Sequence, residues 1–107
     1  MASSKEFLEY VLEQLSPLEG VSYRPMMGEY VIYYQGKVIG GVYDDRFLVK
    51  PTKNALSVMN AAGREPVMDI PYPGAKPMLT ADIDDRELTC RLVQAAADDL
   101  PLPKKKC

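Results

Sequence analysis

Residues 23–50 read YRPMMGEYVIYYQGKVIGGVYDDRFLVK, and this stretch decides the fold. Three runs rich in Tyr, Val and other apolar residues are typical of β-strands and follow one another at 29–34, 37–43 and 47–50. The pairs Gln35-Gly36 and Asp44-Asp45 separate these runs, and residues of these types favour tight turns. We therefore predict an antiparallel meander, in which each strand pairs with the next.

A further strand is predicted at residues 21–27, immediately before this meander. Pro25 lies inside it and has no amide proton to donate to a neighbouring strand. The strand is therefore expected at an edge of the sheet or next to a bulge.

Helices are expected on both sides of the meander because apolar residues recur there at helical spacing. Their predicted ranges are 3–15, with Ser3 as cap, 54–62, with Thr52 or Asn54 as cap, and 84–100, with Asp84 as cap. Residues 66–77 contain four prolines and are expected to form a partly extended loop, and residues 78–83 a last strand. The order α-β-β-β-β-α-β-α, with its strands grouped together, predicts an α+β fold: an antiparallel sheet flanked by N-terminal and C-terminal helices.

Length and charge limit the class of protein. The chain has 107 residues, which suits one domain over residues 1–100 followed by a flexible basic tail at 101–107. The net charge is −2, whereas proteins that bind nucleic acids generally carry a basic excess. Direct nucleic-acid binding is therefore disfavoured, although a local basic patch would still permit it.

Histidine is absent from the sequence, which rules out Ser-His and Cys-His nucleophile pairs within one chain. Cys90 and Cys107 have neither metal-ligand spacing nor the pattern of a disulfide framework, and free thiols suit a reducing cytoplasm. The sequence shows no signal peptide and no apolar run long enough to span a membrane. We expect a cytoplasmic protein, not an enzyme, that uses no cofactor or metal.

Five residues are candidate contacts. Arg24 and Lys50 are cations within apolar strands and could bind an anion or a partner, although Arg24 could instead pair with Glu29 and Lys50 could be a solvated strand end. Met26 and Met27 are flexible side chains, of which strand alternation should expose one. Tyr72 could join Arg24 and Lys50 around a ligand pocket.

Short motifs in this region occur in a recognisable order. They are Arg24-Pro25-Met26-Met27-Gly28, Gly36-Lys37 followed by Gly40-Gly41, and Leu48-Val49-Lys50, with Tyr72 and the strand at 78–83 behind them. In this order the chain resembles the TfoX N-terminal domain family, from about Phe7 to Leu100. The resemblance implies an antiparallel sheet flanked by helices, akin to type III secretion chaperones, and no established catalytic residues.

The same resemblance implies a role. It is to the amino-terminal half of bacterial regulators of competence genes, and we expect a stand-alone version of that domain. The leading hypothesis is a dimeric, non-enzymatic regulatory domain of transcription or competence that acts through protein partners. A nucleic-acid-binding regulator and a small-ligand-binding domain are the alternatives.

Overall fold

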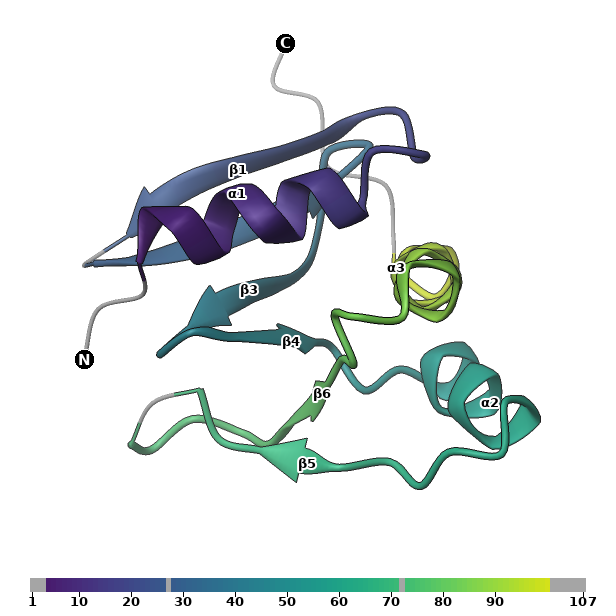
Figure 1. The fold of residues 1–107 in the computed structure, drawn as a ribbon. Coiled ribbons are helices and arrows are strands. Elements are labelled where there is room, and N and C mark those ends of the chain that lie inside the picture. The colour runs from purple at the N-terminus through teal and green to yellow at the C-terminus, as the bar shows by residue number, and fades with distance from the viewer. Residues whose placement is uncertain (1–3, 27, 72, 101–107) are drawn as a thin grey trace, which may run out of the picture.

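The computed structural model describes residues 4–26, 28–71 and 73–100. Its elements, shown in Figure 1, are α1 (Lys5–Gln14), β1 (Val21–Met26), β2 (Glu29–Tyr34), β3 (Lys37–Tyr43), β4 (Arg46–Val49), α2 (Lys53–Ala61), β5 (Met68–Asp69), β6 (Met78–Thr80) and α3 (Arg86–Asp98). The strands form one antiparallel sheet in the order β1-β2-β3-β4-β6-β5. The predicted α+β fold and its meander are confirmed.

Two-residue turns close the hairpins of the meander. Gln35 and Gly36 have φ values of 52° and 81°, and Asp44 and Asp45 have 52° and 56°. Positive φ at both central residues is the geometry of a type I′ turn, whose twist matches that of paired strands. The local turn chemistry therefore sets the register of β2 with β3 and of β3 with β4.

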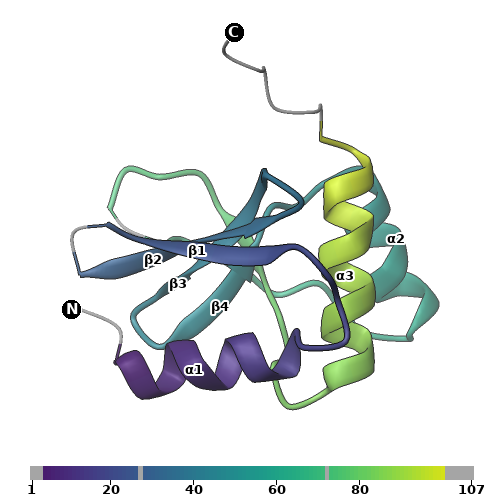
Figure 2. The ribbon, with the colours of Figure 1, turned by 90° about the horizontal axis from the view of Figure 1, so that it is seen from above.

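The hydrophobic core lies between one face of the sheet and the helices. Ile32, Val42 and Phe47 point to this face and pack with residues of all three helices, such as Val11 and Val93. Figure 2 shows α1 along one side of the sheet and α3 crossing near its end, with α2 beside α3. Burying these large apolar side chains is the main stabilising contribution, at about 1.5–3 kcal/mol for each.

The opposite face of the sheet, here called the outer face, carries a second set of side chains. Strand register places Arg24, Val31, Leu48 and Thr80 on it, in line across β1, β2, β4 and β6. Val31 and Leu48 are buried although they are not part of the main core cluster. The described part of the segment between β5 and β6 lies on this side of the sheet, away from α1 (Figure 2).

Gly41 sits between Val31 and Leu48 on the outer face. A Cβ atom there would come within 2.6 Å of the Tyr43 ring and of the Tyr30 carbonyl oxygen. The Tyr43 ring therefore covers the glycine, and any larger residue at position 41 would displace it. This close contact explains why position 41, the second of the Gly40-Gly41 pair, is a glycine.

Several predicted boundaries were wrong by a few residues. Ser4, not Ser3, caps α1, accepting a hydrogen bond from Phe7 N at 3.1 Å. Asp85, not Asp84, caps α3, because a turn from Asp82 to Asp85 precedes the helix. For the same reason the last strand stops at Thr80 rather than at residue 83.

Other predictions concern the loop and the ends of the chain. Part of the predicted loop forms β5, so the order becomes α-β-β-β-β-α-β-β-α. Residues 101–107, the predicted tail with Cys107, lie outside the described residues, and the domain boundary at residue 100 stays a prediction. Within the described part of the chain, no helix is both long and apolar enough to cross a membrane.

Candidate functional site

β1 is an outermost strand of the sheet, so of the two positions predicted from Pro25, an edge or a place next to a bulge, the structure has the edge. The Gly20 carbonyl oxygen accepts a hydrogen bond from Gln35 N at 2.8 Å, so the backbone groups of residue 20 face β2. Because these groups alternate along an antiparallel strand, those of Val21, Tyr23 and Pro25 face away from β2. Proline at such a position costs the sheet no hydrogen bond, whereas Val21 and Tyr23 present amide protons to the outside.

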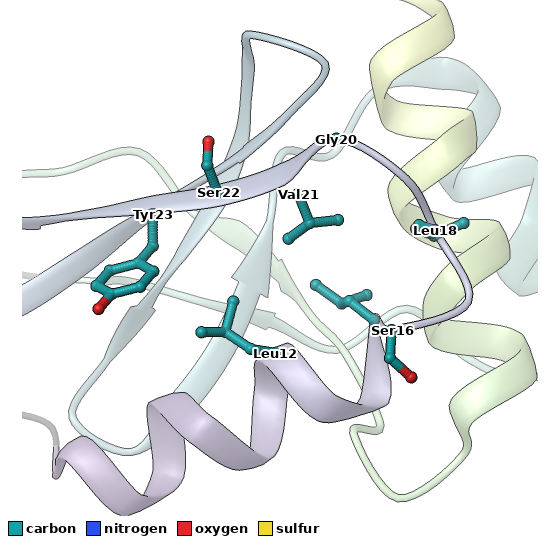
Figure 3. A pocket seen from close by; sticks show the side chains of 8 residues that line it. Leu12, Ser16, Leu18, Gly20, Val21, Ser22 and Tyr23 are labelled. Carbon is teal, nitrogen blue, oxygen red and sulfur yellow. The ribbon is translucent and has the colours of Figure 1, made fainter.

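A hollow of about 490 Å³ lies beside this edge, between β1 and the end of α1. Figure 3 shows the residues that line it, which are mostly apolar: Leu12, Leu15, Ser16, Leu18, Gly20, Val21, Ser22 and Tyr23. The Tyr23 side chain is on the same side of the sheet as α1, is 42% exposed and makes an edge-to-face contact with Tyr30 at 5.9 Å between ring centroids. An aromatic side chain and an apolar hollow therefore lie next to each other on an exposed strand edge.

The structure places two of the predicted contact residues on the same strand. Arg24 and Met26 both point to the outer face of β1, and Met26 is 45% exposed. Arg24 takes part in none of the ion pairs found among the described residues. The alternative pairing with Glu29 is not formed, and a Glu29 carboxylate oxygen accepts a hydrogen bond from Asp44 N at 2.6 Å instead.

Lys50 is not brought together with Arg24. It directly follows β4, and β2 and β3 separate that strand from β1. The two cations therefore form neither one pocket nor one continuous basic surface. Met27 and Tyr72, the other two candidates, lie outside the described residues, so the predicted pocket near Tyr72 stays untested.

A second hollow, of about 390 Å³, surrounds Lys50. Its lining comes from β3, from the link between β4 and α2, and from the segment before β6: Tyr43, Lys50, Pro51, Thr52, Pro71, Ala75, Lys76, Pro77 and Met78. Sequence reasoning missed Lys76, because only the pairing of β4 with β6 brings its segment to Lys50. The proline-rich composition of residues 66–77 was the one feature of the sequence that could have drawn attention to this segment.

The acidic residues before α3 have structural partners. Arg64 donates to Asp82 and Asp85 at 2.8 Å each, which ties the end of α2 to the start of α3. The Tyr10 hydroxyl donates to Asp84 at 2.6 Å, and this hydrogen bond holds the pKa of Tyr10 above its usual value. The described residues contain no group of three or more His, Cys, Asp or Glu side chains placed to hold a metal ion.

Cys90 is buried under the end of α1. Its thiol donates to the Gln14 carbonyl oxygen at 3.3 Å, and burial raises the pKa of the thiol. A raised pKa keeps the sulfur protonated, and the thiolate is the reactive form of cysteine. Cys90 is therefore a packing residue.

These features define a small α+β domain with an exposed strand edge and a hollow on each side of its sheet. The chain belongs to the TfoX N-terminal domain family, whose model matches residues 13–100. It is also 35% identical over 112 residues to the uncharacterized 12.7 kDa protein in the trpE 5′ region of Spirochaeta aurantia, with 99% of this chain and 90% of that protein covered. Membership confirms the predicted family and supports a regulatory domain at the level of the family.

Proposed function

We propose that this chain is a non-enzymatic regulatory domain of the TfoX type that works through protein partners, the first of which is a second copy of itself. Family membership supports the regulatory role. The observation that carries the interaction is the edge of β1, where Val21 and Tyr23 turn their backbone groups away from β2. An unpaired strand edge is a template for adding another strand.

The donors of this edge fit a symmetric pairing of two β1 strands. With a two-fold axis at Ser22, Val21 of one copy faces Tyr23 of the partner subunit, and each residue exchanges two hydrogen bonds with the other. Every outward amide proton of Val21 and Tyr23 then has an acceptor. Pro25 falls beyond the paired residues, so its missing proton costs nothing in this register.

The side chains of this edge also favour a second copy of the chain as the partner. Residues directly opposite each other in an antiparallel pair share a face, so Tyr23 of the partner subunit would lie beside Val21 and over the hollow of about 490 Å³. The same contact repeats on the other side of the axis, which makes the surface complementary to itself. Each exposed tyrosine thus buries its ring in an apolar hollow that a monomer leaves open to water.

The proposed setting is the bacterial cytoplasm, and the regulated process is transcription of competence-type genes. The cytoplasmic setting is supported by the free, buried thiol of Cys90, which suits a reducing compartment. The proposed process extends the family membership from the level of the domain to a particular process.

Light scattering coupled to size-exclusion chromatography tests the self-association. The chain has a mass of 11.9 kDa, so the weight-average mass should rise toward twice this value as the loaded concentration increases to tens of micromolar. A mass that stays at 11.9 kDa over the whole range would overturn the proposal.

A further inference from the structure

We propose that the hollow around Lys50 is a binding site for a small organic anion, a molecule with a flat apolar body and one carboxylate or phosphate group. This proposal is independent of the pairing of β1. The hollow lies at the other end of the sheet, beside β3, β4 and β6.

The charge of the lining points to an anion. Lys50 and Lys76 line the hollow, and none of the described residues that line it is acidic. Within the described parts of the chain, neither lysine side chain takes part in an ion pair or a hydrogen bond. The Lys50 residue is partly buried, and a partly buried cation is better stabilised by an opposite charge than by none.

The chemistry of the walls points to a flat apolar body. Tyr43, Pro71, Pro77 and Met78 supply apolar surfaces, and the volume of about 390 Å³ lies in the range of small-molecule sites. The tyrosine ring offers a flat face against which a planar ligand can stack, and the proline rings add aliphatic surface. A few cations at an otherwise apolar site would then fix the orientation of the ligand.

Ordered backbone holds both walls of the hollow. The Tyr43 ring is held over Gly41, and the Lys50 amide donates to the Ile39 carbonyl oxygen at 2.8 Å. Both side chains therefore begin from ordered backbone in the sheet. The opposite wall, with Lys76, belongs to the segment before β6, which the pairing of Met78 with Asp69 holds in place.

Amide chemical shifts in two-dimensional NMR test the proposal with named probes. The probes are 1-naphthoate and 1-naphthyl phosphate, which share the flat body and separate a carboxylate ligand from a phosphate ligand, and the neutral analogue 1-naphthamide. We expect saturable shifts centred on Tyr43, Lys50 and Ala75 for at least one anion, with a dissociation constant of about 0.1–1 mM. The neutral analogue should bind about tenfold more weakly.

Variants separate the two parts of the site. Lys50→Met and Lys76→Met should each weaken the anion about three- to tenfold, whereas Lys5→Met, an exposed lysine of α1, should leave it unchanged. Ala75→Phe, which fills the hollow from a surface segment, should abolish binding of all three probes. The proposal is overturned if neither anion gives saturable shifts, if the shifts map to another region, or if 1-naphthamide binds as tightly as the anions.

Discussion

Arg46 of β4 and Asp69 of β5 form an ion pair, although β6 lies between their strands in the sheet. The Asp69 carboxylate also accepts a hydrogen bond from Ile70 N at 2.9 Å, and Arg46 Nε donates to the Tyr43 carbonyl oxygen at 3.2 Å. β5 has only two residues and therefore few ladder hydrogen bonds of its own. The ion pair thus fastens this short strand, and the start of the segment that walls the Lys50 hollow, to the centre of the sheet.

Removing the charge of Asp69 should loosen β5 without unfolding the domain. In Asp69→Asn, we expect faster hydrogen exchange of the amides from Met68 to Ile70, whereas amides of the core strand β3 keep their protection. Glu87→Gln, which removes an exposed pair with Arg91 on α3, is the matched control and should change neither region. Unchanged exchange at β5 in Asp69→Asn would show that the ion pair does not hold the strand.

The same pair predicts a pH dependence. The hydrogen bonds from Arg46 and from Ile70 N lower the pKa of Asp69 below its ordinary value. A carboxylate whose pKa is lower in the folded state stabilises the fold above its unfolded pKa of about 3.9, and this contribution is lost as the pH falls through the folded pKa. The melting temperature of wild type should therefore exceed that of Asp69→Asn at neutral pH, and the difference should shrink below about pH 4. A difference that grows on acidification would contradict this assignment.

Two threonines whose hydroxyl oxygens are buried should respond differently to the same substitution. The Thr80 hydroxyl is buried without a hydrogen-bond partner among the described residues, whereas the Thr89 hydroxyl donates to the Asp82 carbonyl oxygen at 2.8 Å. Thr80→Val should leave the free energy of unfolding unchanged or raise it by up to about 1 kcal/mol, and Thr89→Val should lower it by about 1–2 kcal/mol. Urea denaturation measures both values. A loss in Thr80→Val as large as that in Thr89→Val would mean that the Thr80 hydroxyl does have a partner.

Local chemistry explains how much of the fold the sequence predicts. Turns such as Gln35-Gly36 are decided by the residues that form them, so the meander could be inferred. Pro25 limited its strand to an edge or a bulge, and the structure has it at the edge. Helix caps were misplaced by one residue at Ser3 and at Asp84, because an adjacent Ser or Asp can cap equally well and only packing selects between them.

The candidate site depended on long-range pairing that the sequence does not display. Arg24 and Lys50 both stand out as cations in apolar strands, but strand order places them on β1 and after β4, too far apart for one site. Lys76 reaches the Lys50 hollow only because β6 pairs with β4. Glu29, the predicted partner of Arg24, instead accepts a hydrogen bond from the backbone amide of Asp44 in the neighbouring turn.

The proposed pairing of two β1 edges depends on the Tyr23 amide proton. Tyr23→Pro removes this proton without costing a hydrogen bond to β2, because the backbone groups of Tyr23 face away from that strand. Tyr23→Val removes the same ring and keeps the proton, so it is the matched control. Amide spectra of both variants should first establish that the fold is retained.

Sedimentation equilibrium of wild type, Tyr23→Val and Tyr23→Pro is the most direct measurement. We expect Tyr23→Val to dimerise more weakly than wild type, since it lacks the ring that would enter the hollow. Tyr23→Pro should raise the dimer dissociation constant about tenfold or more beyond Tyr23→Val, since a dimer loses two backbone hydrogen bonds. Equal dissociation constants for the two variants, or a wild-type chain that is monomeric at every concentration, would show that two β1 edges do not pair.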